Sequence, residues 1–285
     1  MSTKATVSEA DAIITVTLDR QEKLNAIDEE MTAVMFSALE QLRSRDDLRV
    51  MVITGVGRYF TAGIDLQSPT GGGGEFDPED VWSGAKYRAH LRNHFRLYEE
   101  FEYVEKPIVL AAQSHCLGAG VEMAVCCDFR LAAEGATFGL PEIRLGVMPA
   151  SGGVSRLVRL VGPGWARWLA MADRRVDAET AVRIGLFHEV LPAEGFHDRV
   201  HQFAVELTRI PPAAMGLTKV TIDACADVDR RTARDLDRFA NTSLNFGPEF
   251  RAELNRFRLE AEERAARRSA DSAAEGPEGP APQKR

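Results

Sequence analysis

Two short stretches decide the fold class of this 285-residue chain. Residues 58–66 read RYFTAGIDL and residues 114–122 read SHCLGAGVE, and each places small residues at a turn after an apolar run. The apolar runs are residues 50–54 (VMVIT) and 107–112 (PIVLAA), a pattern typical of strands buried on both faces. Buried strands that alternate with helical segments predict an α/β fold.

Further strands and helices are predicted on both sides of these turns. Residues 12–18 (AIITVTL) alternate as in a strand, and Asp28 is placed to cap the helical pattern that follows it. The remaining predictions are a helix over 81–104, a helix from about Gly120, a strand over 129–133, three helical patterns in 151–184 and a strand over 186–190. From residue 195 onward the pattern indicates helices alone, over 195–209, 212–224, 229–245 and 248–268.

This change from alternating strands and helices to helices alone predicts the domain organisation. We expect a catalytic core over residues 1–200 and a helical region over 201–268. Residues 269–285 are rich in Ala, Glu, Gly and Pro, a composition that predicts a disordered tail. A second Gly-rich stretch, residues 68–74, predicts a flexible loop.

Composition narrows the class of function. The chain carries 35 Lys and Arg against 43 Asp and Glu, a net charge of −8, which argues against nucleic acid and anionic membranes as partners. No apolar stretch approaches the roughly 20 residues of a membrane span. The four cysteines form no CxxC pair and no Cys/His ligand spacing, so we expect no metal site. These features predict a cytoplasmic protein.

The two Gly-containing turns are candidates for binding negative charge. Backbone N–H groups at a helix N-terminus favour anions, and small side chains let a substrate approach the backbone. Two such turns at the ends of neighbouring strands could form a two-donor oxyanion hole. The alternative is that both are packing turns, in which glycine merely avoids a clash.

Two acids follow these turns. Glu122 lies in the first turn of a predicted helix, and Glu142 lies in residues 138–149 (FGLPEIRLGVMP). Apolar sequence neighbours would raise the pKa of each carboxyl, and two acids that share a site separate in pKa. The alternatives are an ordinary helix-start acid and a solvent-facing loop acid.

Taken together, these residues resemble the crotonase superfamily, the enoyl-CoA hydratase/isomerase family, over about residues 12–257. The motifs that carry the resemblance are residues 23–26 (KLNA), 60–66 (FTAGIDL), 106–112 (KPIVLAA), 117–122 (LGAGVE), 127–128 (CD), 141–146 (PEIRLG) and 152–153 (GG). The resemblance implies a spiral of ββα turns followed by a C-terminal helical oligomerisation region. It also implies a homotrimer or a dimer of trimers.

The resemblance assigns roles to single residues. It implies that Glu122 and Glu142 add water to a 2-enoyl-CoA and that the N–H groups of Ala62 and Ala119 form the oxyanion hole. Coenzyme A would enter as part of the substrate, with no permanently bound cofactor. The residues implied to contact the substrate are Lys23, Leu24, Ala26, Ala62, Gly63, Ile64, Asp65, Leu66, Gly118 and Arg251.

Two departures from the family pattern keep other reactions open. The segment between Asp65 and Lys106 is longer than in typical hydratases, and the sequence around Asp65 is close to the dienoyl-CoA isomerase form. Those isomerases carry a further acid where this chain has Ala150. The alternatives are a double-bond isomerase, a hydratase-lyase that acts on an aromatic acyl-CoA, and a non-catalytic acyl-CoA-binding protein.

Overall fold

The computed structural model describes residues 4–68 and 81–274. The predicted Gly-rich loop therefore lies mostly outside the described residues. Contacts between α-carbons divide the chain into two compact units, Met1–Val220 and Thr221–Arg285. The first unit extends beyond residue 200 because helix α6 (Phe196–Thr208) packs against its larger sheet.

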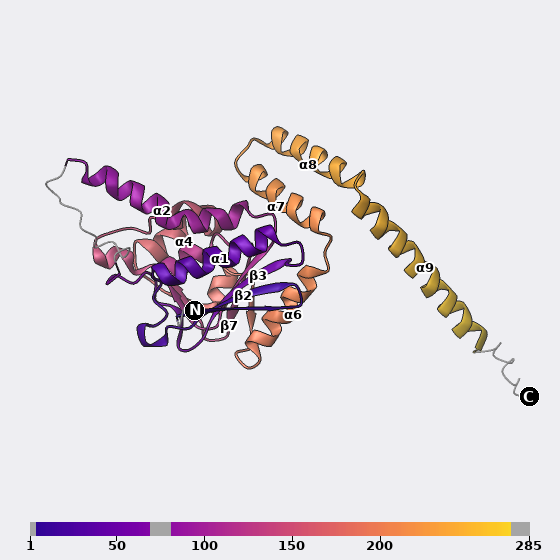
Figure 1. Cartoon of the computed structure of the whole chain (residues 1–285), viewed down its shortest axis with the longest axis horizontal. Helices are drawn as coiled ribbons and strands as arrows, with labels where there is room; N and C mark the ends of the chain where they lie inside the picture. Colours follow the sequence, from indigo (N-terminus) through magenta and orange to yellow (C-terminus); the bar gives the residue numbers. More distant parts are fainter. Residues whose placement is uncertain (1–3, 69–80, 275–285) are drawn as a thin grey trace, which may run out of the picture. The chain divides into compact units, whose positions relative to one another are not determined.

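The larger sheet has six strands in the order β1-β2-β3-β5-β7-β10 (Figure 1). Strands β1 and β2 form an antiparallel hairpin, and β2, β3, β5, β7 and β10 are parallel. Their bounds are β1 (Ala5–Ala10), β2 (Ile13–Leu18), β3 (Val50–Gly55), β5 (Ile108–Ala112), β7 (Phe129–Ala133) and β10 (Glu189–Leu191). Strand β1 is absent from the sequence prediction, because its mostly exposed residues lack an apolar alternation.

A second sheet holds four short strands in the order β4-β6-β8-β9. They are β4 (Tyr59–Thr61), β6 (His115–Leu117), β8 (Thr137–Gly139) and β9 (Val176–Asp177). Each of the pairs β3–β4, β5–β6 and β7–β8 takes the chain from the larger sheet to the smaller one, and a helix follows. This repetition confirms the predicted spiral of ββα turns. Strands of two or three residues are too short to produce a periodic signal in the sequence.

The helices of the first unit follow the predicted order. They are α1 (Glu29–Ser44), α2 (Ser83–Tyr103), α3 (Ala119–Ala124), α4 (Gly153–Ala170), α5 (Ala178–Arg183), α6 and the part of α7 (Pro212–Ala226) up to Val220, with the 3-10 turns η1 (Gln21–Lys23) and η2 (Pro141–Leu145). Asp28 caps α1 as predicted, because its carboxylate accepts the Met31 N–H at 3.0 Å.

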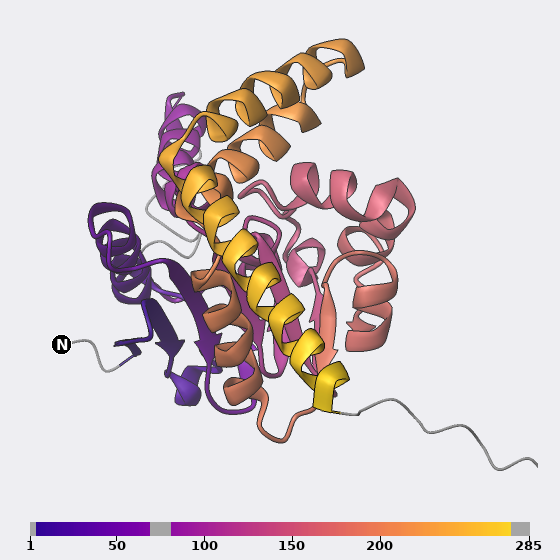
Figure 2. The ribbon, with the colours of Figure 1, turned by 90° about the vertical axis from the view of Figure 1, so that its right-hand side faces the viewer.

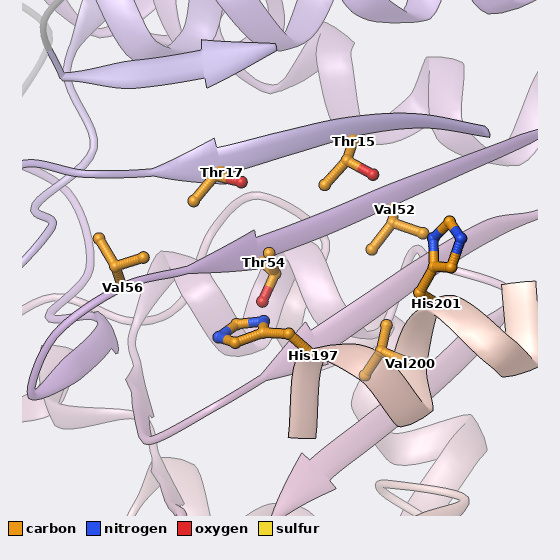
Figure 3. Close-up of a pocket in the computed structure, with 8 residues that line it drawn as sticks. All are labelled: Thr15, Thr17, Val52, Thr54, Val56, His197, Val200 and His201. Carbon is orange, nitrogen blue, oxygen red and sulfur yellow. The ribbon is translucent and has the colours of Figure 1, made fainter. Parts of the chain in front are cut away.

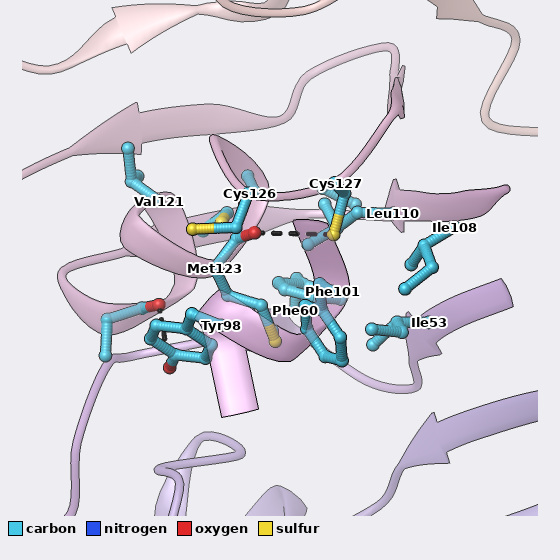
Figure 4. Packing of buried hydrophobic residues seen from close by; sticks show 14 of the residues in the cluster. Ile53, Phe60, Tyr98, Phe101, Ile108, Leu110, Val121, Met123, Cys126 and Cys127 are labelled. Carbon is cyan, nitrogen blue, oxygen red and sulfur yellow. Dashed lines mark hydrogen bonds between the residues drawn. The ribbon is translucent and has the colours of Figure 1, made fainter. Parts of the chain in front are cut away.

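The larger sheet is buried on both faces, as its continuous apolar strands predict. On one face Ile53, Ile108 and Leu110 pack with Phe60 and Phe101 in the main core (Figure 4). On the opposite face alternate residues of the same strands pack against α6 (Figure 2). The turns identified in the sequence belong to the main-core side, since Phe60, Cys116 and Ala119 are all members of that cluster.

A cavity of about 260 Å³ lies on the α6 side, between that helix and strands β2 and β3 (Figure 3). It is lined by Thr15, Thr17, Val52, Thr54, Val56, His197, Val200 and His201. Val52 and Val200 belong to the apolar cluster beneath α6. This cavity is therefore on the other side of the sheet from the two Gly-containing turns.

The second unit contains helices α8 (Arg230–Asn245) and α9 (Pro248–Ala274). Helix α8 buries no residue, and both helices leave large apolar side chains exposed, among them Phe239 and Phe257. Helix α9 continues through Ala274, so the first part of the predicted disordered tail is helical, and residues 275–285 lie outside the described residues. Within the described ranges, no helix is both long and apolar enough to cross a membrane.

Candidate active site

Three neighbouring parallel strands, β4, β6 and β8, end at one edge of the smaller sheet. Thr61 is in register with Cys116, and Leu117 is in register with Gly139. The two Gly-containing turns follow β4 and β6, and Glu142 follows β8. The sequence prediction that the turns lie at the ends of neighbouring strands is therefore confirmed, and the second acid lies at the same edge.

The two turns lie against each other. A Cβ atom at Gly63 would make an ordinary contact, 3.6 Å from the Ala119 nitrogen, whereas one at Gly118 would lie 2.8 Å from Glu142 Oε1 and displace that side chain. Gly118 also has a φ of 55° and a ψ of −124°, a conformation that favours glycine. Glycine at these two positions lets two backbone turns and a carboxylate share one small space.

Two N–H groups in this space are free. Ala119 is the first residue of α3, and no acceptor among the described residues takes its N–H. The same holds, in the part of the chain that the structure describes, for the N–H of Ile64, whose neighbours Gly63 and Asp65 are bonded to Ile27. A free N–H pair of this kind is suited to an oxyanion.

The prediction of Ala62 as a donor needs correction. Its N–H donates to the Leu24 carbonyl at 3.0 Å and is therefore unavailable to a substrate. The N–H of Gly63 donates to Thr61 Oγ1 and that of Asp65 donates to the Ile27 carbonyl, so among the described residues of this turn the free N–H belongs to Ile64. The sequence motif locates the turn but does not show which of its N–H groups is free.

Asn25 holds the first turn in place. This buried residue has a φ of 53° and accepts the Arg20 N–H at 2.6 Å. Its Nδ2 donates to the carbonyls of Val56 at 2.9 Å and Tyr59 at 2.8 Å, and its own carbonyl accepts the Thr61 hydroxyl at 2.7 Å. The bonds to Tyr59 and Thr61 tie Asn25 to strand β4, so the segment implied to contact CoA is fixed to the first Gly-containing turn.

Glu122 is buried, with 4% of its surface exposed, on the first turns of α3. Its Oε1 accepts the Ser151 N–H at 2.9 Å, just before the N-terminus of α4. Burial raises the pKa of Glu122, while hydrogen bonds from Ser151 and Gly153 and the charge of Arg156 lower it. The net effect is a raised pKa, although these hydrogen bonds and the arginine favour the carboxylate form.

Glu142 has a different environment. Its Oε2 is buried and, among the described residues, has no hydrogen-bond partner. Burial, together with the neighbouring Glu122 charge, raises the pKa of Glu142 to about 7. The two carboxyls therefore differ in their hydrogen bonds, and neither is a solvent-exposed acid.

The remaining predicted contact residues lie around the first turn, with one exception. Lys23 is exposed, and its Nζ donates to Gln67 Oε1 at 2.9 Å. Leu24 and Ala26 belong to the same segment as Lys23. Leu66 is 55% exposed. Arg251 lies on α9 in the second unit, and its role near CoA stays a prediction.

Asp65 has a structural contact rather than a free carboxylate. It accepts the Gln67 N–H at 3.0 Å and Arg20 Nη1 at 2.8 Å, and these bonds lower its pKa despite burial. These bonds help to close the turn, and the predicted contact of Asp65 with the substrate stays a prediction.

Ser151 and Gly153 are site residues that the sequence reading missed. Both donate to Glu122 from the start of α4. The feature of the sequence that could have identified them is the glycine pair 152–153 before a helical pattern. It indicates a helix N-terminus whose N–H groups can bind a carboxylate. Among residues 4–68 and 81–274, no group of three or more His, Cys, Asp or Glu could hold a metal ion.

Comparison with known families agrees with this geometry. A family model described as enoyl-CoA hydratase/isomerase matches residues 8–258. The chain belongs to this family. It is a member of the crotonase superfamily, and its ββα spiral with a C-terminal helical region is the fold that the sequence predicts.

Individual relatives carry related names. Carnitinyl-CoA dehydratase from Salmonella enteritidis is 35% identical over 217 residues, which cover 76% of this chain and 78% of that protein. The enoyl-CoA hydratase structure from Bacillus anthracis has a TM-score of 0.81 at 28% identity, covering 90% of this chain and 96% of that one. An enoyl-CoA hydratase from Thermoplasma volcanium has a TM-score of 0.78 at 27% identity, covering 90% of this chain and 97% of that one.

Proposed function

We propose that this family member is an enoyl-CoA hydratase that adds water syn across the double bond of a 2-enoyl-CoA thioester. The observation that carries the proposal is the pairing of two unlike carboxyls beside two free N–H groups. Glu122 accepts hydrogen bonds as a carboxylate, whereas Glu142 has an unpaired buried oxygen and a pKa of about 7. Hydration needs such a pair, because one group must accept a proton while the other donates one.

The free N–H groups of Ile64 and Ala119 receive the thioester carbonyl oxygen. As water attacks Cβ, electrons shift from the double bond onto this oxygen and give an enolate. Each donor aimed at that charge contributes about 2.7–4 kcal/mol to transition-state stabilisation. The same pair of N–H groups serves the reverse reaction.

The acid–base roles follow from position. Glu142 Oε1 lies against Gly118, the residue before Ala119, whose N–H binds the oxyanion. The Cα atom of the substrate is one bond away from the thioester carbonyl carbon and so lies on the same side. Glu142 therefore delivers its proton to Cα. Glu122 takes a proton from the water that attacks Cβ, so the C–O and Cα–H bonds form while the double bond breaks. In the dehydration direction the two roles reverse, which suits a family whose relatives include enzymes named dehydratases.

The rest of the proposal concerns the substrate and the assembly. Coenzyme A enters as part of the substrate, and Lys23 and Arg251 supply positive charge for its phosphates; no resident cofactor takes part. The exposed apolar residues of α8 and α9 support a homotrimer or a dimer of trimers, since large apolar side chains on an isolated helix need a partner.

The direct test is incubation with crotonyl-CoA and with a medium-chain 2-enoyl-CoA. We expect loss of the conjugated thioester absorbance together with formation of a 3-hydroxyacyl-CoA, identified by mass. A 3-enoyl-CoA that converts to the 2-enoyl form with no hydroxylated product would establish the isomerase instead. If neither chain length nor an aromatic 2-enoyl-CoA yields the hydroxyacyl product, hydration is the wrong reaction.

Two variants distinguish catalysis of hydration from a non-catalytic acyl-CoA-binding role. Glu122→Gln and Glu142→Gln should each lower kcat by about 10²- to 10⁴-fold with CoA binding retained, because each removes one proton-transfer group. Glu134→Gln is the matched control, since this exposed glutamate follows β7 and lies outside the site. Equal activity in all three variants would point to binding alone.

A further inference from the structure

The N-terminal turn of α4 is held from two sides. On one side the Ser151 N–H donates to Glu122 Oε1 at 2.9 Å. On the other side Arg156, one turn into α4, folds its guanidinium back over Gly152, so that a Cβ at Gly152 would lie 1.7 Å from Nη1. Gly152 has a φ of 85°, so a glycine is required both by backbone conformation and by the arginine above it.

Arg156 is itself anchored to a third helix. Its Nε donates to Glu102 Oε1 at 2.6 Å and its Nη2 donates to Glu102 Oε2 at 2.5 Å, a bidentate pair between α4 and the end of α2. Its Nη1 also points to the Ser151 carbonyl at 3.4 Å. With four-fifths of its side chain covered, the guanidinium has little freedom to leave this position.

These contacts form a chain from α2 through α4 to the buried acid of α3. We propose that Arg156, anchored by Glu102, is a positioning residue that holds the Ser151–Gly153 turn around the Glu122 carboxylate. Arg156 donates no hydrogen bond to Glu122 among those the structure describes, so it acts through the turn and through its charge. The kinetic part of this inference rests on the proposed hydratase function.

Removing the charge of Arg156 and removing the charge of Glu102 should shift the pKa of Glu122 in opposite directions. The groups that face Glu122 are Glu142 of η2, Tyr98 of α2, Cys126 just after α3 and Arg156 of α4. Burial raises the pKa of Tyr98 and of Cys126, so both stay neutral near pH 7. Arg156 is thus the cation that favours the Glu122 carboxylate, and Glu102 partly neutralises that cation.

The test is to follow the carboxyl carbon of Glu122 by ¹³C NMR through a pH titration of the full chain, with the signal assigned by its loss in Glu122→Gln. Arg156→Met should raise the pKa of Glu122, and Glu102→Gln should lower it, because the arginine then lacks its counter-charge. Arg156→Lys keeps the positive charge but loses the bidentate geometry of the guanidinium, so the titration of Glu122 in this variant should stay nearer to that in wild type. Arg167→Met removes a cation from the last turn of the same helix and is the control.

A structural role alone predicts a different result. In that case all three variants lose thermal stability while Glu122 titrates as in wild type, and the proposal is overturned. If Arg156→Met does not fold, Glu102→Gln and Arg156→Lys decide the question.

The effect of these variants on kcat is measured separately. Arg156→Met should lower kcat by about 10- to 100-fold through misplacement of Glu122. Absence of hydration in wild type would remove the proposed function, whereas the NMR titration needs no substrate and still decides the role of Arg156.

Discussion

The backbone of Gly118 lies directly against the carboxylate of Glu142, and a Cβ atom at position 118 would stand 2.8 Å from Glu142 Oε1. This contact joins the oxyanion turn to the general acid. It exists because β6 and β8 are neighbours in the smaller sheet and end in register. A substitution at Gly118 therefore disturbs two functional groups at once.

Gly118→Ala should lower kcat by about 100-fold, because the methyl group displaces Glu142 from the position beside the oxyanion hole. It should also destabilise the fold by about 1–3 kcal/mol, since φ at this position is positive. The measurements are steady-state kinetics and thermal unfolding. Gly135→Ala separates the two effects: φ there is 81°, but no atom lies within 4 Å of the new Cβ, so stability should fall and kcat should not.

Ala119→Pro should lower kcat by about 10²- to 10³-fold by removing one oxyanion donor. Proline is tolerated at the first position of a helix, where its missing N–H leaves no intrahelical bond unmade. Ala119→Ser keeps the donor and is the control. Stopped-flow or steady-state rates with a saturating enoyl-CoA give the comparison. Equal rates for the two variants would show that this N–H does not bind the developing charge.

The rate of hydration should depend on the protonation of Glu142. Its pKa of about 7 means that the proton needed at Cα is present below this value and is lost as the pH rises through it. We therefore expect kcat/KM for hydration to fall above about pH 7. The value for dehydration should fall over the same range, because the reaction takes up no net proton and its pH-independent equilibrium constant fixes the ratio of the two values. The pair titrates as a coupled unit, so the midpoints belong to both acids together. A flat profile from pH 6 to pH 9 in both directions would contradict the assigned roles.

Glu142 should also make the folded state less stable as the pH rises. The carboxyl has a folded pKa of about 7 against an ordinary value of 4.5, so between these values the unfolded chain ionises while the folded chain does not. This raised pKa costs about 1–3 kcal/mol above pH 7 and nothing below pH 4. Glu142→Gln should therefore have a higher Tm than wild type at pH 8 and an equal Tm at pH 4. A Tm difference that is the same at both pH values would exclude ionisation as its cause.

Lys219 should be essential for stability but not for catalysis. This buried lysine of α7 donates to Asp128 Oδ2 at 2.8 Å and to the Phe101 carbonyl at 2.7 Å. Lys219→Met leaves the Asp128 charge buried without its cation, which should cost about 3–5 kcal/mol. The double variant Lys219→Met with Asp128→Asn should recover part of this loss. Urea unfolding measures both, and KM for the enoyl-CoA should stay unchanged.

The elements that the sequence predicts well are the long ones. Strand β7 coincides with the predicted range, β3, β5 and helices α6, α7 and α8 lie within two residues of their predicted bounds, and α1 begins after the predicted cap, Asp28. The strands are continuous apolar runs and the helices repeat an apolar pattern, and both signals can be recognised locally. The strands of the smaller sheet have two or three residues, and their positions follow from pairing with distant strands rather than from a local pattern.

The sequence alone determined which residue types are available for chemistry. The acids at positions 122 and 142 and the small residues of the two turns are properties of the chain, and their motifs are sufficient to indicate the family. Tertiary structure decided which groups are free to act. The Ala62 N–H donates to the Leu24 carbonyl and so is not the free donor that the motif predicts, whereas the Ile64 N–H has no acceptor among the described residues. Hydrogen-bond partners and burial depend on segments far apart in the sequence, and for that reason no local motif shows which N–H is free or which acid keeps its proton.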